Sequence, residues 1–182
     1  MCLVSSLRLA GKASNWLRPV KPVLSRNEEL PLSRISEKNV RFRTRQEICR
    51  DVSLVLNDPR LHVGTKYAVV DQVLWVWSEF DGKHTGCKYW SKKARASGSK
   101  RGGLVHEHLV PRGIVREKIF ALRNPTPTAV RRTLQTWCVG VVVTRDEDDR
   151  LNELGLRQSM PDTWDKRNKW ARYEEAGIAI AD

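Results

Sequence analysis

The chain has 182 residues, of which 40% are hydrophobic and 30% charged, a composition that excludes a fibrous or wholly disordered protein. Its 33 lysines and arginines against 21 aspartates and glutamates leave a net charge of +12, which favours a polyanionic partner such as nucleic acid. The apolar runs are too short to span a bilayer, so we expect no membrane association.

Residues 1–42 show no sustained hydrophobic periodicity, and Pro19, Pro22 and Pro31 interrupt any helix there. We interpret this segment as a basic, extended or partly disordered arm that precedes a single α+β domain over residues 43–182. An organellar transit peptide or an arm that lies on nucleic acid has the same kind of composition.

Two helices are expected next. Thr44 followed by Glu47 is a capping box, and the helix that it begins should end at Asn57–Pro59. A second helix should run from near Thr65 to Asp81–Gly82, with an apolar stripe that includes Trp77. Trp75 lies off this stripe, and both tryptophans are expected in the core.

Residues 82–101 form the most basic stretch, with seven lysines or arginines and no acid. Two aromatic residues lie within it, so the cations could hold phosphates while the rings stack on bases. A solvated loop and a short helix whose aromatics fill the core is the alternative. With Arg112 added, the predicted nucleic-acid-binding residues are Lys83, Lys88, Tyr89, Trp90, Lys92, Lys93, Arg95, Lys100, Arg101 and Arg112.

The remaining pattern predicts an α+β fold that is mostly helical with a small two-stranded β element. Apolar and polar residues alternate up to Pro111, which is typical of a strand. Gly155 should end a short acidic helix capped by Thr144. The expected elements are a strand near 104–108, helices at 114–122 and 126–137, a strand at 138–143, and helices at 145–154 and 164–176.

His106, Glu107 and His108 carry the clearest chemistry. In an extended segment the two histidines point to one face and the carboxylate to the other. Phosphodiester hydrolysis needs a base for water, a cation at the phosphate and basic residues that position the backbone. This region offers all three kinds of group. A structural role, in which the histidines satisfy nearby backbone groups, is the alternative.

The sequence Glu107-His108-x-x-Pro111 resembles the opening motif of the HNH, or ββα-metal, nucleases, in which a second strand and a helix follow. The resemblance covers residues 104–154 and implies an HNH-like ββα core. It implies a divalent-metal-dependent endonuclease that hydrolyses DNA, of the kind found in mobile elements and defence systems. It assigns His108 as the general base, Glu107 as a ligand of Mg²⁺ or a similar cation, Asp148 or else Asn152 as the helix ligand, and His106 as a further ligand or an orienting residue.

Other assignments stay open. His84 and Cys87 could bind a metal ion together with His106. The acidic run at 146–149 is also typical of a solvated helix start. The four cysteines lack C-x-x-C spacing, which argues against a zinc ribbon and predicts reduced thiols in the cytoplasm. A non-catalytic nucleic-acid-binding protein is the second hypothesis. A protein-binding inhibitor of a nucleic-acid enzyme, which would use Trp164 and Trp170, is the third.

Overall fold

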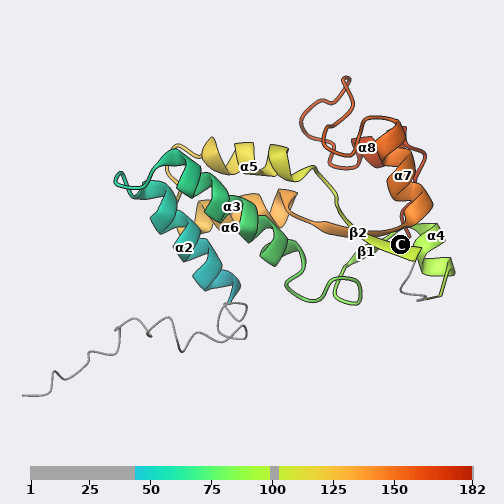
Figure 1. Ribbon diagram of the computed structural model, residues 1–182, viewed down its shortest axis with the longest axis horizontal. Coiled ribbons are helices and arrows are strands. Elements are labelled where there is room, and N and C mark those ends of the chain that lie inside the picture. Colours follow the sequence, from blue (N-terminus) through green and yellow to red (C-terminus); the bar gives the residue numbers. More distant parts are fainter. Residues whose placement is uncertain (1–43, 99–102, 182) are drawn as a thin grey trace, which may run out of the picture. The chain divides into compact units, whose positions relative to one another are not determined.

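The computed structural model describes residues 44–98 and 103–181, so the predicted arm at 1–42 and the predicted contacts Lys100 and Arg101 lie outside the described residues (Figure 1). The fold is mixed α+β and about half helical. The helices are α2 (Arg45–Asn57), α3 (Val63–Ser78), α4 (Lys92–Ala96), α5 (Arg112–Phe120), α6 (Pro127–Trp137), α7 (Arg145–Glu153) and α8 (Ala171–Glu175). The strands are β1 (Tyr89–Trp90), β2 (Leu104–His108) and β3 (Gly140–Thr144).

The sheet has three strands in the order β1-β3-β2, not the two that the sequence pattern predicts. β2 and β3 are antiparallel, and their register pairs Leu104 with Thr144 and His108 with Gly140. β1 pairs with β3 in parallel, Tyr89 opposite Val141. A strand of two residues is too short to show a period of two, so only its pairing reveals it.

Burial of the strands follows from their places in the sheet. β3 is the central strand and its valines are fully buried on both faces, as its unbroken apolar sequence requires. β2 lies at an edge, where buried residues alternate with half-buried ones. The alternation places His106 and His108 on one face and Glu107 on the other.

The expected helix starts are confirmed by their caps. Thr44 with Glu47, and Thr144 with Glu147, each form a complete capping box. α6 begins with Pro127 after the cap residue Thr126, as predicted.

The last helix is much shorter than the predicted 164–176. Trp164 donates from Nε1 to the carbonyl of Asn168 at 2.7 Å, and the Asp165 carboxylate accepts from the amide of Asn168 at 2.8 Å. Lys166 has a positive φ of 63°. These local bonds hold residues 164–168 as a turn, because aspartate and asparagine side chains compete with helical hydrogen bonding.

In Figure 1, α2, α3, α5 and α6 lie together beyond one end of the β2–β3 pair, whereas α4, α7 and α8 surround its other end. One large cluster of buried apolar residues, which includes Leu74, Leu109, Leu134, Val141 and Tyr173, runs through both groups. Within the described part of the chain, no helix is both long and apolar enough to cross a membrane.

Candidate functional site

A cavity of about 400 Å³ opens where β2 ends. α3 contributes Trp75 to its wall, α5 contributes Arg112, and the loop after α7 contributes Arg157 and Gln158. Glu107, His108 and Pro111 complete the lining. Three of the residues predicted from sequence, Glu107, His108 and Arg112, are therefore brought together here.

His108 is a buried and neutral wall of this cavity. It is 5% exposed, and its ring lies edge-on to Trp75 with 5.1 Å between centroids. Burial lowers the pKa of His108 to about 3, the charges of neighbouring basic residues act in the same direction, and a hydrogen bond to the backbone of Leu74 opposes them. Its Nε2 has no hydrogen-bond partner among the described residues. The ring therefore keeps one nitrogen unused at neutral pH.

His106 is held rigidly on the same face of β2, 5.8 Å from His108 between ring centroids. The carbonyl of Lys83 lies 2.5 Å from Nδ1 of His106, so we assign the proton to that nitrogen. Sγ of Cys87 is 3.2 Å from the same atom. A Cβ at Gly140 would lie 2.5 Å from Cε1 of His106, so only glycine leaves room for the ring. This geometry suits an orienting residue.

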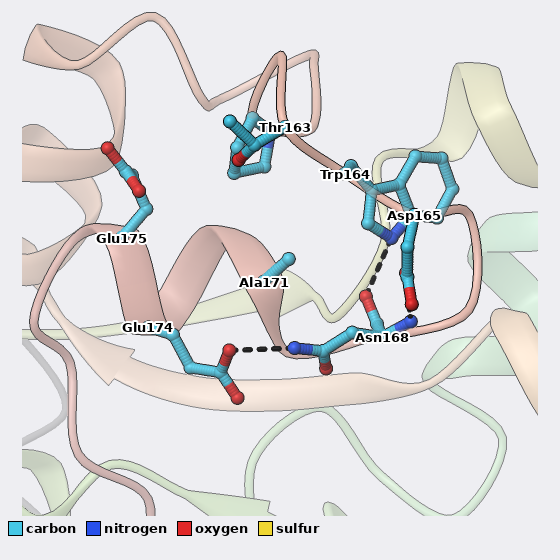
Figure 2. A pocket seen from close by; sticks show the side chains of 8 residues that line it. Thr163, Trp164, Asp165, Asn168, Ala171, Glu174 and Glu175 are labelled. Carbon is cyan, nitrogen blue, oxygen red and sulfur yellow. Dashed lines mark hydrogen bonds between the residues drawn. The ribbon is translucent and has the colours of Figure 1, made fainter.

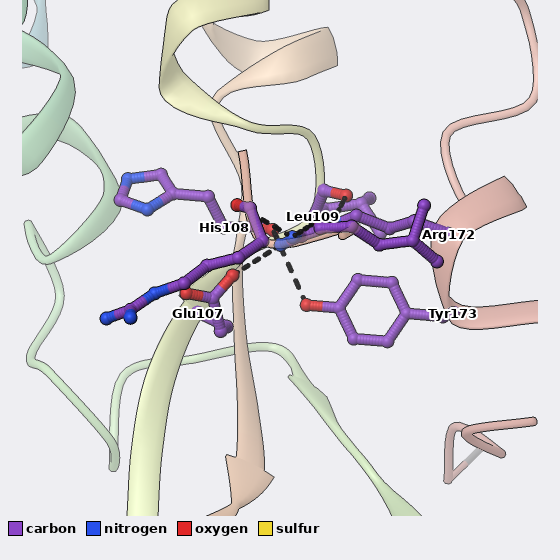
Figure 3. A network of polar contacts seen from close by, with 7 residues as sticks. Glu107, His108, Leu109, Arg172 and Tyr173 are labelled. Carbon is purple, nitrogen blue, oxygen red and sulfur yellow. Dashed lines mark hydrogen bonds and ion pairs between the residues drawn. The ribbon is translucent and has the colours of Figure 1, made fainter. Parts of the chain in front are cut away.

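Glu107 faces the other way and meets a buried arginine (Figure 3). Its Oε2 is ion-paired with Arg172, whose side chain is fully buried while that of Glu107 is 17% exposed. Figure 3 shows the guanidinium meeting the Glu107 carboxylate, while the ring of His108 points away from it. The guanidinium also donates to the backbone carbonyls of His108, Leu109, Leu156 and Arg157. Arg172 thus joins the end of β2 to the loop after α7.

Tyr173 belongs to the same network. Its hydroxyl donates to the carbonyl of His108 at 3.4 Å. Burial raises the pKa of this hydroxyl above its ordinary value, Glu107 and Asp148 raise it further, and Arg172 lowers it. Asp148 is 6% exposed and lies 3.9 Å from the guanidinium of Arg145.

A divalent cation does not fit the predicted ligands as they are placed. Glu107 is engaged by a fixed guanidinium, and a cation beside it would be repelled. Among residues 44–98 and 103–181, no group of three or more His, Cys, Asp or Glu side chains could hold a metal ion. Burial raises the pKa of Cys87 to about 11, so this thiol stays protonated and is a poor ligand.

The acidic start of α7 has a structural task. Glu147 is 4% exposed, accepts from the amide of Thr144 at 2.9 Å and accepts from Oγ of Ser91 at 2.5 Å. Ser91 is also the N-cap of α4, so one carboxylate connects two helix starts. Asn152 is exposed. Of the described residues, neither Asp148 nor Asn152 lines the cavity beside His108.

In the basic segment the aromatic side chains pack against the core, whereas the cationic side chains lie at the surface. Tyr89 and Trp90 are half-buried in β1 and pack against the core, so the structure places them as the core-filling alternative does. Nε1 of Trp90 donates to the carbonyl of Cys87 at 3.1 Å. The described cations of this segment all lie at the surface: Lys83, Lys88, Lys92, Lys93 and Arg95.

A second pocket has the wrong charge for a polyanion (Figure 2). It is lined by Asp165, Glu174 and Glu175 together with Trp164 and Asn168. Figure 2 shows the hydrogen bonds of Asn168 to Trp164 and to Glu174, the latter at 2.7 Å, holding the surrounding loop. Trp164, like Trp170 nearby, is half-buried against the core, so the two do not form the exposed patch that an inhibitor would use.

No protein-family model, no curated protein and no solved structure matches this chain. Several residues of the site carry no sequence signal. Arg172 lies 65 positions from Glu107, and Trp75 belongs to a helix that reads as a core element. Arg157 and Gln158 lie in a loop without a motif. The sequence predicts Trp75 in the core together with Trp77, but the structure buries Trp77 and leaves Trp75 37% exposed.

Proposed function

We propose that the chain binds nucleic acid, DNA foremost, in the cavity at the end of β2 and hydrolyses a phosphodiester bond there with His108 as general base. One observation carries the proposal: a neutral imidazole with an unused Nε2 shares a cavity with Arg112 and Arg157. Guanidinium groups pair with phosphate through two parallel hydrogen bonds, so the cavity suits a phosphodiester.

The order of elements supports an HNH-like assignment. Antiparallel β2 and β3 are followed at once by α7, which is the ββα order that the resemblance implies. The connection from β2 to β3 holds α5 and α6, and Arg112, at the start of α5, reaches the cavity. The inserted helices thus supply a cation to the site.

The proposed reaction is a displacement at phosphorus. The negative charge of a bound phosphate raises the pKa of His108 above its value of about 3 in the free protein, so the ring can act as a base. A water molecule then gives one proton to Nε2 of His108 while its oxygen bonds to phosphorus, and the ring later returns this proton to solvent. The bond from phosphorus to one sugar oxygen then breaks, and that oxygen takes a proton from solvent. Arg112 and Arg157 stabilise the charge on the phosphate oxygens. His106 holds its place through Lys83 and steadies the neighbouring ring.

A non-catalytic nucleic-acid-binding protein is the second candidate, and the enclosure of His108 favours it. Nε2 is buried, and the ring packs against Trp75. The side chains around this nitrogen have to move before water reaches it, whereas binding at the cavity mouth needs no such movement.

The test is nicking of supercoiled plasmid by the purified full chain, run with Mg²⁺, with Mn²⁺ and with a chelator. His108→Gln should abolish nicking, and His62→Gln should leave it unchanged. His62 is exposed before α3, about 20 Å along that helix from Trp75 by the usual 1.5 Å rise per residue. Circular dichroism of both variants controls for folding. Full activity in His108→Gln would rule out His108 as the general base. A salt-sensitive gel shift without nicking would establish that the chain is a non-catalytic nucleic-acid-binding protein.

A further inference from the structure

Two neighbouring helices present matched side chains beside the cavity. Tyr67, Asp71 and Trp75 are spaced four residues apart on α3, as are Arg112 and Arg116 on α5. Residues at this spacing lie on one face of a helix. Tyr67 is 47% exposed and Trp75 37%, although large aromatic residues are usually covered. We call these five residues the α3–α5 ridge.

The ridge is internally ordered by charge and ring contacts. The guanidinium of Arg116 lies 3.9 Å from the ring centroid of Tyr67, and that of Arg112 lies 4.2 Å from that of Trp75. Asp71 contacts both arginines, at 2.5 Å to Arg116 and 3.3 Å to Arg112. One carboxylate faces two guanidinium groups, so the ridge stays positive. Its arginines are held in place before any ligand arrives, which reduces the entropy lost on binding.

The ridge runs into the candidate site. Trp75 and Arg112 belong to both the ridge and the cavity, and Trp75 touches the ring of His108. A chain that follows the ridge from Tyr67 toward Trp75 therefore arrives at the candidate base.

We infer that the α3–α5 ridge binds single-stranded nucleic acid and leads it to the cavity. Exposed rings give unpaired bases a surface to stack on, and fixed guanidinium groups hold the phosphates between them. The bases of a duplex are already stacked on one another and cannot use these rings. The inference rests on the proposed function in taking His108 and its cavity as the destination of the strand.

The experiment is fluorescence anisotropy of labelled 20-nucleotide probes with the full chain in chelator: a deoxythymidine strand, a uridine strand and a DNA duplex. We expect both single strands to bind at least about tenfold more tightly than the duplex. Trp75→Ala should weaken single-strand binding about tenfold or more, the usual loss of a stacked base. Arg112→Gln with Arg116→Gln should lower the slope of log affinity against log salt by about 1.4, as expected for two lost phosphate contacts.

Phe80→Ala is the matched control. Phe80 is also 37% exposed, lies 4.5 Å from the guanidinium of Arg45 and has an ion pair, Arg45–Asp81 at 2.7 Å, beside it. It has the same chemistry but does not line the cavity, so its loss should leave affinity unchanged.

Equal affinity for duplex and single strand, or equal losses in Phe80→Ala and Trp75→Ala, would overturn the inference. If the ridge variants weaken binding but the parent protein does not cleave DNA, only the proposed hydrolysis is overturned. If the parent protein cleaves DNA but the ridge variants bind as well as it does, only the inference about the ridge is overturned. The uridine and thymidine probes decide between RNA and DNA.

Discussion

The two faces of strand β2 come from five consecutive residues, yet they meet opposite surroundings. On one face the rings of two histidines are buried. His106 contacts Lys83 and Cys87, and His108 contacts Trp75. On the other face Glu107 meets the buried charge of Arg172. The first face carries imidazole rings, whereas the second carries a structural ion pair. Alternation along the strand points the side chains to opposite faces, although both Glu107 and His108 reach the cavity where β2 ends.

This difference assigns separate tasks to residues that the motif presents together. A carboxylate next to a histidine in sequence suggests a shared metal site, but the carboxylate is engaged by a guanidinium on the opposite face. Four predictions test the contrast between the faces, beginning with the one that should cost most.

Arg172→Leu should destabilise the protein by about 3–5 kcal/mol, because removing one partner of a buried ion pair leaves the other uncompensated. Chemical denaturation measures the loss. Arg132→Leu, at an exposed site on α6, should change stability by less than about 0.5 kcal/mol. A cost at position 172 no larger than at position 132 would mean that the charged face contributes nothing to the fold.

Gly140→Ala should cost about 2–3 kcal/mol through overpacking, since the new Cβ would lie 2.5 Å from Cε1 and 2.9 Å from Nε2 of His106. Gly113→Ala is the control, because the Cβ there meets only Nη2 of Arg116 at 3.6 Å and alanine favours the helix. Thermal unfolding should show a lower Tm for the first variant and an equal or higher Tm for the second. A similar change in Tm in both variants would mean that the histidine face of β2 is loosely packed.

Acidification should destabilise the histidine face. The folded pKa of His108 is lowered to about 3 from an ordinary value of 6.5, so the unfolded chain takes up a proton first. The stability is complete above pH 6.5 and is lost as the pH falls toward 3. Between pH 7 and pH 5 we expect a loss of about 2 kcal/mol from this residue, or roughly 6 °C in Tm.

His108→Gln isolates that contribution, because the other groups titrate in both proteins. The fall in Tm from pH 7 to pH 5 should be smaller in the variant than in the parent protein. Identical falls would place a different residue behind the pH dependence.

Glu107→Gln should have the smallest effect, about 1 kcal/mol, because Arg172 keeps its carbonyl acceptors and the amide oxygen replaces the carboxylate as a partner. Denaturation beside Arg172→Leu measures it. A loss as large as that of Arg172→Leu would show that the ion pair, and not the carbonyl contacts, carries the stability of this face.

Local signals predicted much of the fold. Capping residues at Thr44, Thr126 and Thr144 marked helix starts that the structure confirms, because a cap acts within one turn. The alternation in 104–108 marked a strand with both histidines on one face. The third strand was missed, since two residues have no periodicity and β1 exists only through its pairing with β3.

The candidate site was predictable in part. The motif located Glu107 and His108, and the flanking basic residues included Arg112; the three share a cavity because they lie within six residues of one another around the end of one strand. Trp75, Arg157 and Arg172 were missed, because their roles depend on distant elements meeting at that end.

By itself the sequence determined the net charge, the helix starts and the two faces of β2, because charge is additive and because caps and alternation act over a few residues. What each face meets depends on the tertiary structure. Long-range packing set Arg172 against Glu107 and Trp75 against His108, and it left the rings of the basic segment half-buried against the core while those of the α3–α5 ridge stayed exposed. Such pairings depend on how separate elements pack against one another, which no short-range pattern specifies.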